Sequence, residues 1–530
     1  MGALLSIFAD FVSIVHLLLD PVYQFRKAYA RAALDPGLPV PSPTYPRWMR
    51  DPPHPDLQER QSDKLPSKVD VAIIGSGISG AAAAYSLLQS DNEAKFSKIA
   101  VFEARELCSG ATARNGGHIK ASAWDCYTRI KKHLGPERAV VLTRFQRKHL
   151  DVLVGLCKDL GLDAAEAREV ETVDLFLDRE SFEKAVMKVD ETTKALPEEE
   201  YKIWDRLQAQ KQFGTGRSVY GALSYKAGAI WAYRFVTSIW DYLMKKFPDI
   251  LSIETYTPVN KIAVDDLQAP KGYPYAVQTP RGTVYARQIV HATNAYASHL
   301  IPGLRRKITP LRAHMSAQKP GNQFPPEYNA NRSVSVIYGD GFDYITQLRP
   351  EEDGAPPNQG DLMIGGGFAR TVKDGVDMVG VSDDAEPLEG LTVAHISGVF
   401  PAVFSPNWGV GGGLKEAWSG ILGFTGDLMP LVGRLDTNVT GRVPSNDTEP
   451  KTGGMPAGEW IMAGFSGEGM VWSWLCGMAL GLEMTGHDDD EELTFPGRPN
   501  GRVGDWFPDE LWVSEKRLKS ADASNLPSQM

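Results

Sequence analysis

Three glycines in the sequence have the spacing G-x-G-x-x-G, a pattern that can bind the phosphates of a dinucleotide. The apolar segment Val69–Ile74 leads into them, and helix-forming residues follow. The first glycine permits a tight turn, the second lets the backbone approach a pyrophosphate, and the third lets the helix pack closely on the strand. The amino end of that helix offers unpaired N–H groups to the phosphates. The expected phosphate-binding positions are Gly75, Gly77, Ile78, Ser79 and Gly80.

An acidic residue at the end of the next strand completes this motif. A ribose-binding carboxylate is expected about 20 residues after the glycines, and Glu103 closes the apolar segment that begins at Ile99. It comes later than usual because the polar residues 90–97 lengthen the connection between helix and strand. Ala104 and Arg105 follow directly and are expected at the same site. A glycine turn in an unrelated α/β fold would not need strand, helix and acid together.

A polar, glycine-rich loop follows the ribose-binding strand, and it favours FAD over NAD. An NAD enzyme would more often continue directly into another βα unit, whereas a loop of this kind can run beneath a second ring system. Backbone N–H groups of the two adjacent glycines could approach a flavin, and the arginine could face phosphate or ring oxygens. The expected cofactor contacts in residues 108–118 are Thr112, Arg114, Asn115, Gly116, Gly117 and His118.

The remaining elements must hold these loops together. Residues 123–210 are rich in helix formers and in leucines at 3.6-residue spacing, which predicts a largely helical segment. Residues 222–246 predict a glycine-alanine turn and then an apolar helix. Alternating apolar residues predict strands within 251–292 and 334–368, and the segment 460–465 leads into a helix near 470–482.

We therefore expect the α/β class, with a discontinuous Rossmann-type FAD-binding domain and a substrate domain built from a mixed sheet plus helices. The FAD-binding domain is assigned to residues 69–122, 226–306 and 418–486, and the substrate domain to 123–225 and 307–417. A helical segment (1–34) and a Pro-rich extended arm (35–68) precede them. Residues 487–530 are expected to wrap the surface or fray.

Composition excludes some classes of function. The net charge is −10 and the pI about 5.6, so no nucleic acid partner is expected. The four cysteines have no CxxC or metal-like spacing, which predicts no metal site and reduced thiols in a cytoplasmic protein.

The N-terminus could bind a membrane surface. Apolar residues in 1–25 fall at helical spacing, although the run is too short to span a bilayer. Such a helix can lie on a membrane surface or dock on its own protein. Gly2 and Ser6 also fit a permissive N-myristoylation pattern.

The motifs together resemble the FAD-dependent amine and amino-acid oxidoreductase family, which includes D-amino-acid oxidase, glycine oxidase and sarcosine oxidase. The loop 109–117 and the stretch 48–55 look closest to the γ-glutamylputrescine-oxidase-like branch. Segments 259–262, 290–296 and 463–470 also match, so the resemblance covers about residues 46–486.

The resemblance implies further cofactor contacts. The backbone at Val259 would meet the adenine, and the strand-to-loop segment with Thr293 and Asn294 would close around the dinucleotide. The helix after residue 470 would point its amino end at the pyrimidine end of the flavin, where its dipole stabilises negative charge. The implied positions in the C-terminal flavin loop are Gly464, Ser466, Gly467, Glu468, Gly469 and Met470.

Three departures from the family pattern matter. Gly420 stands where relatives with covalently attached FAD carry cysteine, which predicts non-covalent FAD, with Cys108 as an alternative attachment point. Met363 stands where sarcosine-oxidase relatives place a lysine near flavin N5, which puts rapid reaction with oxygen in doubt. Glu468 stands where histidine is common.

The implied chemistry is oxidation of a C–N bond of an amine or amino acid to an imine, with hydride transfer to flavin N5 and reoxidation by molecular oxygen or another electron acceptor. Trp418 and Tyr344, with Met363, are the candidate catalytic-site residues, and Tyr338 and Trp472 could extend an aromatic wall that suits an amine. His118 and His314 could be polar pocket groups, and Arg312 could pair with a substrate carboxylate.

The sequence leaves two other interpretations of the function open. The chain could be a biosynthetic tailoring enzyme that oxidises a nitrogen-containing intermediate whose imine then cyclises. It could also be a non-catalytic binding protein on an FAD-type fold, although the loops ending at His118 and containing Glu468 resemble flavin-binding loops.

Overall fold

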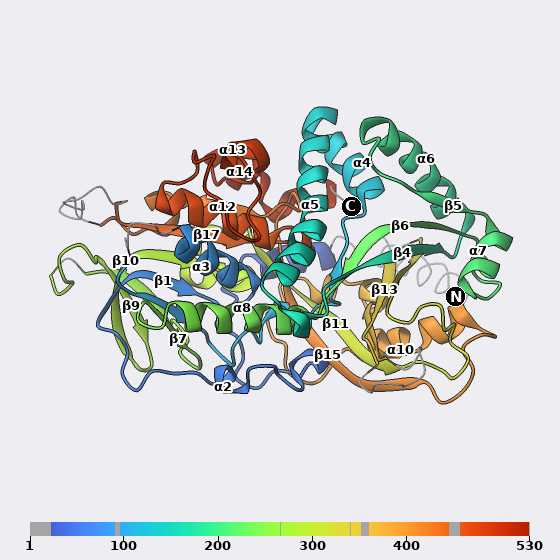
Figure 1. The fold of residues 1–530 in the computed structure, drawn as a ribbon, viewed down its shortest axis with the longest axis horizontal. Coiled ribbons are helices and arrows are strands. Elements are labelled where there is room, and N and C mark those ends of the chain that lie inside the picture. The colour runs from blue at the N-terminus through green and yellow to red at the C-terminus, as the bar shows by residue number, and fades with distance from the viewer. Residues whose placement is uncertain are drawn as a thin grey trace, which may run out of the picture.

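Two β-sheets and the helices between and around them form the protein (Figure 1). The computed structural model describes residues 23–90, 96–265, 267–339, 341–350, 360–444 and 456–528. In Figure 1 the first sheet, with β1, β10 and β17, lies on the left, and the second sheet, with β4, β6 and β13, lies on the right. This arrangement confirms the α/β class and the mixed-sheet architecture expected from the sequence.

The first sheet has eight strands among the described residues, with β1 and β10 at its centre. Its central order is β16-β17-β10-β1-β2-β7, and β8 and β9 form an antiparallel extension on β10. β1 pairs in parallel with both β2 and β10. The strands are β1 (Lys68–Ile74), β2 (Ile99–Phe102), β7 (Leu251–Glu254), β8 (Lys261–Val264), β9 (Tyr275–Thr279), β10 (Gly282–His291), β16 (Leu431–Arg434) and β17 (Gly458–Ala463).

The second sheet has nine strands among the described residues, and most of its pairs are antiparallel. Its order is β15-β11-β14-β13-β12-β4-β6-β3, with β5 paired to β6. The strands are β3 (His118–Ile119), β4 (Arg168–Phe176), β5 (Lys202–Trp204), β6 (Gly221–Ala229), β11 (Thr309–Lys319), β12 (Arg332–Tyr338), β13 (Gly341–Gln347), β14 (Leu362–Gly366) and β15 (Gly413–Phe424).

Helices cover both sheets and fill the space between them (Figure 1). α3 and α12 pack against each other, and α5 stands between the two sheets in the figure. The helices are α2 (Pro55–Gln58), α3 (Ile78–Ser90), α4 (Ala123–Leu134), α5 (Pro136–Asp159), α6 (Arg179–Ala195), α7 (Arg206–Phe213), α8 (Ala232–Lys246), α9 (Ala297–Leu300), α10 (Gly390–Phe404), α11 (Thr437–Thr440), α12 (Ser473–Thr485), α13 (Val503–Trp506) and α14 (Glu515–Ser520).

Several strands were not expected from the sequence, among them β3, β5, β11, β15 and β16. Two more are β4 and β6. β4 lies inside the segment read as largely helical, and β6 replaces the predicted turn before α8. Charged residues at the start of β4 obscure its alternation, and Asp174 occupies an inward position because Lys120 pairs with it there. Long-range strand pairing, which no local pattern records, decides these two elements.

The Pro-rich arm is packed rather than free. Trp48 and Met49 are almost fully buried, and Thr44 donates its backbone N–H to the Asp384 carbonyl. The arm therefore joins the first sheet's loops to the second sheet. Residues 23–32 ahead of it are helical, whereas the predicted membrane-binding segment and the acylation pattern at Gly2 fall largely outside the described residues.

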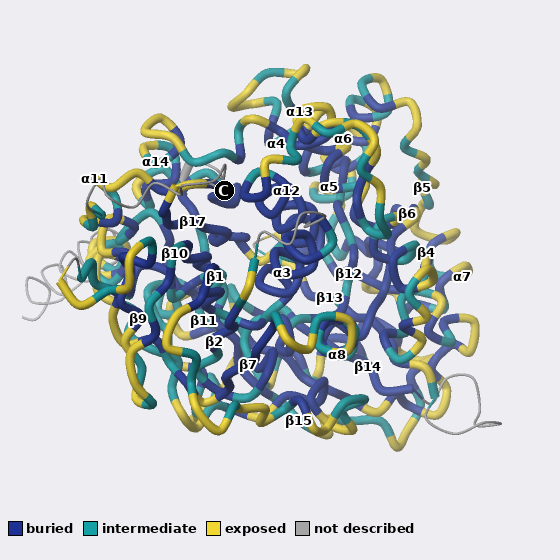
Figure 2. The backbone as a smooth tube through the Cα atoms, turned by 60° about the vertical axis from the view of Figure 1, so that its left-hand side comes forward, coloured by how far each residue is buried: buried dark blue, intermediate teal, exposed yellow. Residues whose placement is uncertain are grey.

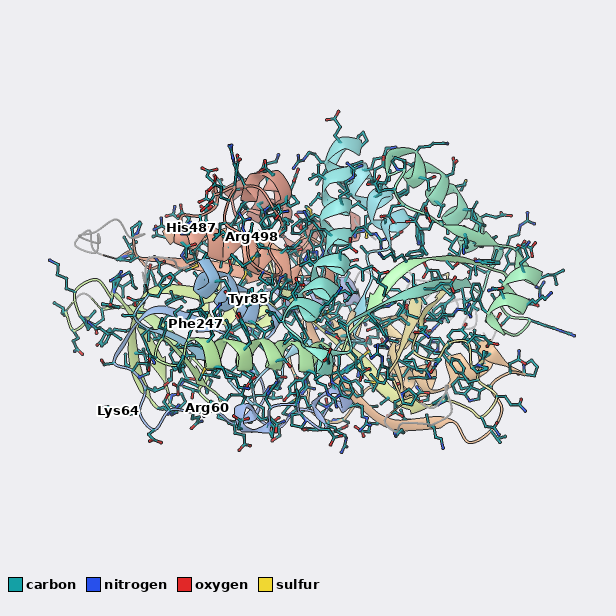
Figure 3. All side chains as sticks on the ribbon, in the orientation of Figure 1. Arg60, Lys64, Tyr85, Phe247, His487 and Arg498 are labelled. Carbon is teal, nitrogen blue, oxygen red and sulfur yellow. The ribbon has the colours of Figure 1, made fainter. Side chains whose placement is uncertain are left out.

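The chain after residue 487 folds back onto α3 and α12. Tyr85 of α3 packs against Trp474 and Phe495, and its hydroxyl donates to the Pro496 carbonyl. Figure 3 shows Tyr85 and Arg498 in the same region of the molecule. The C-terminal segment therefore wraps the body, one of the two outcomes that the sequence left open.

The largest buried cluster lies where α3, α8 and α12 meet the first sheet. Figure 2 shows β1, β10, β17 and these helices mostly in the colour of buried residues. β1 is buried along all but its first residue, as expected for a parallel strand covered on both faces. Among the described residues, no helix is long and apolar enough to cross a membrane.

Candidate functional site

The turn between β1 and α3 requires glycine at two of its three motif positions. Gly75 has a φ of +104°, and a Cβ there would lie 2.5 Å from the Ala292 carbonyl oxygen. A Cβ at Gly80 would lie 2.0 Å from the Gly75 carbonyl oxygen and 3.5 Å from Ile73. The turn and the close approach of helix to strand therefore have the geometry that a dinucleotide motif needs.

Gly77 is the motif position that faces away from the packed interior. A Cβ there would meet only Thr112, whose Oγ1 would lie 3.0 Å away. That oxygen also accepts the backbone N–H of Ile78 at 3.1 Å. The loop after β2 thus contacts the amino end of α3, and the backbone of Gly77 stays partly accessible to solvent.

Glu103 lies directly after β2 and beside the glycine turn. Its carboxylate accepts the backbone N–H and the hydroxyl of Ser76, at 3.1 and 2.6 Å, and the backbone N–H of Arg105 at 3.2 Å. Glu103 and Ala104 are partly exposed. The acid is therefore held at the turn, as the motif requires. Val259 is buried in the core of the first sheet, so its proposed contact with adenine would be made by its backbone.

Arg105 and Arg114 converge on one buried carboxylate. Asp384 lies 2.9 Å from Arg105 Nη1 and 3.3 Å from Arg114 Nε. Arg114 also donates to the carbonyls of Ser109 and Ser419. Burial lowers the pKa of Arg114 to about 10, with Arg105 contributing, while Asp384 opposes the shift. Arg114 therefore points at protein oxygens rather than along an open face toward a ligand.

The loop at residues 115–117 lies between the arm and the second sheet. A Cβ at Gly116 would lie 2.2 Å from Cε2 of Tyr344. At Gly117, where φ is +64°, a Cβ would lie 2.4 Å from the Ile230 carbonyl oxygen and 2.8 Å from Trp48. A Cβ would collide at both positions, so the loop backbone is packed closely on Tyr344, Ile230 and Trp48.

Hydrogen bonds hold this loop in place. Thr346 donates its hydroxyl to the Gly116 carbonyl at 2.5 Å, and Trp48 donates its indole N–H to the Asn115 carbonyl. The Asn115 side chain accepts the N–H of Gly117 at 2.7 Å. The arm and the second sheet thereby fix the loop from two directions.

Asn294 links the ends of β10 and β17. Its Oδ1 accepts the backbone N–H of Gly464 at 3.0 Å and of Phe465 at 3.4 Å. Ser466 donates its N–H to the Gly423 carbonyl at the end of β15. The two expected loops at residues 293–294 and 464–470 are therefore side by side, and they meet the second sheet at β15.

Glu468, in the C-terminal loop, contacts α5 and α12. Its carboxylate accepts from Gln146 at 3.0 Å and from the Trp472 indole at 3.3 Å. His149 Nε2 accepts the N–H of Leu475 at 3.3 Å in the first turn of α12. Burial lowers the pKa of His149 to about 4, so the imidazole is neutral when it caps the helix.

The candidate substrate residues fall on different faces of the second sheet. Tyr344 pairs in register with Ser335 and Gly365, and its hydroxyl donates to Met315 Sδ. Tyr338 has the opposite parity on β12 and packs with the core near α10. Tyr338 therefore does not share a wall with Tyr344.

Two other candidates are completely buried. Trp418 pairs with Met315 and donates its indole N–H to the Arg114 carbonyl at 3.1 Å. Met363 pairs with Thr346 and Ala317. Both have 0% exposure, so they lie beneath the 115–117 loop rather than on an open wall. Trp472 is also buried and packs on Phe145.

The polar candidates have protein partners. His118 shares a 2.8 Å hydrogen bond with Ser333, and burial holds its pKa well below the usual value. His314 accepts the N–H of Glu389, and burial lowers its pKa to about 4. Arg312 donates to the carbonyls of Ala385 and Pro387, so it closes a loop instead of facing a substrate carboxylate.

Attachment of a cofactor to cysteine has little support in the site geometry. Cys108 has 0% exposure, and burial holds its thiol pKa well above the usual value. At Gly420 a Cβ would lie 3.0 Å from the Cβ of Arg114. All four cysteines are free and buried.

The donor set fits FAD. The amino end of α3 suits a pyrophosphate and Glu103 suits a ribose. Arg105 and Arg114 carry two positive charges and share the one negative charge of Asp384, which leaves a net charge of +1 in this group of three residues. Buried polar atoms without a partner among the described residues lie at Arg105 Nε, Thr293 Oγ1 and Ser473 Oγ. The last is at the amino end of α12, where the resemblance expects the flavin pyrimidine.

Several residues of the site could not be read from the sequence. Asp384 and Thr346 lie far along the chain from the loops that they contact, and Met315 contacts Tyr344 of β13. No motif surrounds them. Strand register brings Thr346 and Met315 to the site, and the loop between β14 and α10 brings Asp384. Trp48 did carry a signal, because it belongs to the stretch 48–55, on which part of the expected resemblance rested.

Comparisons with known proteins agree with this geometry. Residues 70–481 match the family described as FAD dependent oxidoreductase. The probable oxidoreductase OrdL of Rhizobium meliloti (strain 1021) is 21% identical over 440 residues, which cover 82% of this chain and 88% of that protein.

Solved structures are similar in fold. Glycine oxidase from Bacillus cereus ATCC 14579 superposes with a TM-score of 0.57 and 16% identity, over 80% of this chain and 97% of that one. L-proline dehydrogenase from P. horikoshii gives a TM-score of 0.55 and 18% identity, over 80% and 94% of the two chains.

Proposed function

Since this chain belongs to the FAD-dependent oxidoreductase family, we propose that it oxidises a C–N bond of an amine or amino acid to an imine. The observation that carries the proposal is the position of the loop at residues 115–117. Its neighbour Thr112 contacts the amino end of α3, and its Gly116 lies against Tyr344 of the second sheet. A ring held on this loop would face the sheet on which we place the substrate.

Named residues would hold the cofactor. The N–H groups at the start of α3 would bind the pyrophosphate, and Glu103 would accept hydrogen bonds from the ribose hydroxyls. The backbone of residues 115–118 and of 464–470 would hold the ring, with the amino end of α12 toward its pyrimidine. When bound, FAD supplies an acceptor for the hydride that leaves the substrate carbon beside nitrogen.

The chain itself would position the substrate and exclude water. Tyr344, which is partly exposed, lies with the buried thioether of Met315 on the face of the second sheet next to Gly116. His118 and His314 are neutral imidazoles rather than cations at neutral pH, because burial lowers both pKa values. An amine that binds in its neutral form needs no side-chain base, and water would then hydrolyse the imine.

The proposal includes the electron acceptor of the reduced flavin and the cellular compartment of the protein. Molecular oxygen or another acceptor would reoxidise the flavin, and Met363, which has no charge, is completely buried in β14. The four unpaired cysteines support a reducing compartment such as the cytoplasm.

The decisive experiment is anaerobic mixing of the FAD-loaded protein with a panel of amines and amino acids. We expect the oxidised flavin absorbance to disappear with at least one of them and to return with air or an artificial acceptor. If bound flavin resists every amine, the non-catalytic reading gains support. A cyclised product from a larger nitrogen-containing compound would favour the tailoring enzyme.

Cofactor placement has its own test. The variant Gly77→Val should lose FAD, because its side chain would meet Thr112 and cover the backbone that faces the pyrophosphate. Gly398→Val is the matched control, since Gly398 is exposed in α10, outside the expected cofactor loops, and a Cβ there meets nothing within 4 Å. Retention of yellow colour by folded Gly77→Val would show that the site is misplaced.

A further inference from the structure

A surface cavity lies beside the C-terminal loop of the candidate site. Its volume is about 290 Å³, and α4 supplies Arg129, Ile130, His133 and Leu134 to its lining, while the segment after β15 supplies Asp427 and Met429. Ser520 and Asn525 complete the lining, so the cavity lies between α4, the chain that leaves β15 and the C-terminal segment. None of these residues was singled out by sequence motifs.

The cavity borders the flavin loop. Arg129 Nη2 lies 4.0 Å from Glu468 Oε1, and Glu468 follows Gly467 in the loop. A Cβ at Gly467 would lie 3.7 Å from Leu422 Cδ1 and 3.9 Å from Phe424 Cζ, at the end of β15. A molecule that contacts Arg129 in the cavity would thus be separated by this one side chain from Glu468 of the loop that we assign to the flavin.

Arg129 is a cation with weak partners. Its side chain is 17% exposed, and its nearest partners among the described residues are Glu468 at 4.0 Å and Cys126 Sγ at 3.9 Å from Nη2, while Asp125 also acts on it electrostatically. A guanidinium has five N–H donors in a planar fork that matches a carboxylate. Most of this donor capacity is left for a ligand.

The acids near Arg129 are engaged elsewhere. Asp427 is paired with Arg517, and Asp125 is paired with Lys188 at 2.6 Å. Glu468 accepts from Gln146 and Trp472. The positive charge of Arg129 is therefore only partly compensated at the cavity wall. The apolar side chains of Ile130, Leu134 and Met429 border it.

We propose that this cavity is an outer substrate subsite in which Arg129 binds a carboxylate at the far end of an amine substrate. Ile130, Leu134 and Met429 would contact the alkyl chain between the two ends. This inference rests on the proposed function, and it deepens that function by naming the substrate class: an amine with a distal carboxylate. A bidentate guanidinium–carboxylate pair would fix both position and direction.

The probe for the test is glutarate, a dicarboxylate without an amine, titrated calorimetrically into the FAD-loaded protein. Glutaramide is its neutral counterpart. We expect Arg129→Gln to weaken glutarate binding about tenfold or more, since a charge-assisted hydrogen-bonded pair is lost. Arg129→Lys should retain part of the affinity. The matched control is Arg144→Gln, because Arg144 pairs with Glu198 on the surface of α5.

Equal affinity of wild type and Arg129→Gln for glutarate would overturn the inference, as would a wild-type protein that does not prefer glutarate to glutaramide. The same preparations are mixed with 5-aminopentanoate and pentylamine, and flavin reduction is followed. If amines reduce the flavin but glutarate binding does not depend on Arg129, the proposed function stands and the subsite is refuted. If glutarate binding depends on Arg129 but no amine reduces the flavin, the cavity is an anion site and its role in amine oxidation is refuted.

Discussion

At the scale of single residues, the packing of the candidate site depends on two glycines, Gly116 and Gly117. Gly116 leaves room for the ring of Tyr344, and Gly117 leaves room for Trp48. The two large side chains approach the loop from opposite parts of the chain, so the glycines are needed for contact as much as for backbone freedom.

The first prediction concerns the contact of Gly116 with Tyr344. Gly116→Ala should lower the free energy of unfolding by about 1–3 kcal/mol, because its Cβ would overlap the ring and the core would be overpacked. The effect should largely disappear when Tyr344→Ala is combined with it. Denaturant titration of the two single variants and the double variant measures this coupling.

Gly110→Ala is the control for that cycle, because nothing lies within 4 Å of a Cβ there. Additive effects of Gly116→Ala and Tyr344→Ala would contradict the packing that we describe.

At the scale of secondary-structure elements, α3 and α12 pack closely through small residues. A Cβ at Gly477 would lie 2.4 Å from the Cβ of Ala82, and one at Gly481 would lie 2.4 Å from the Cβ of Ser86. Ser86 also donates to the Met478 carbonyl at 2.8 Å. Because we propose that α3 binds the phosphate end of the cofactor and α12 the flavin end, this contact would set the distance between them.

The second prediction tests this helix contact. Gly477→Ala should destabilise the protein by about 1–3 kcal/mol, since the added methyl group forces the helices apart. It should also weaken FAD binding, measured by titration of the apoprotein. Gly398→Ala in α10 should instead stabilise by about 0.5–1 kcal/mol, because that glycine is exposed in a helix with open space around it.

A Gly477→Ala variant as stable as Gly398→Ala would show that α3 and α12 are farther apart than described. If Gly477→Ala loses stability but binds FAD as tightly as the wild type, the contact between α3 and α12 stabilises the fold without setting the geometry of the FAD site.

At the scale of the whole molecule, one buried ion cluster joins the two sheets and the arm. Asp384 binds Arg105 and Arg114 from the loops of the first sheet, and Thr44 of the arm donates to the Asp384 carbonyl. Asp384 is 1% exposed. Two guanidinium groups would face each other without it.

The third prediction follows from this cluster. Asp384→Asn should cost about 3–5 kcal/mol in the free energy of unfolding, because it leaves buried cations without their carboxylate. Glu198→Gln is the control, since Glu198 is 46% exposed in its pair with Arg144 and should change stability by at most about 1 kcal/mol. Similar losses in the two variants, measured by urea titration, would refute the buried role of Asp384.

The fourth prediction is a loss of stability in mild acid. Burial lowers the pKa values of His149 and His314 to about 4, whereas both would titrate near 6.5 in the unfolded chain. The unfolded state therefore binds protons first as pH falls, and the stability present above pH 6.5 is lost down to about pH 4. Each histidine should account for about 2 kcal/mol between pH 7 and pH 5.

Urea titrations at pH 7 and pH 5 check this expectation. His149→Gln and His314→Gln should each reduce the difference between the two pH values, and the double variant should reduce it further. An unchanged difference in both single variants would mean that these imidazoles are not held neutral by burial.

The sequence by itself determined the cofactor end of this protein. Strand, glycine turn, helix and Glu103 are neighbours along the chain, so local spacing predicts their geometry, and β1, α3 and β2 follow the predicted ranges closely. Family motifs then linked the distant loops to FAD. These features can be predicted from the sequence because each depends on a short stretch of chain whose backbone conformation allows few residue types.

Only the tertiary structure decided the substrate end. The register of the second sheet places Tyr344 beside Gly116 and turns Tyr338 to the other face, and it buries Trp418 and Met363. The loop fold gives Arg114 and Arg312 protein partners, and the meeting of α4 with the end of β15 leaves Arg129 in a cavity. Such contacts join residues separated by hundreds of positions, and a single residue of register reverses which face a side chain occupies.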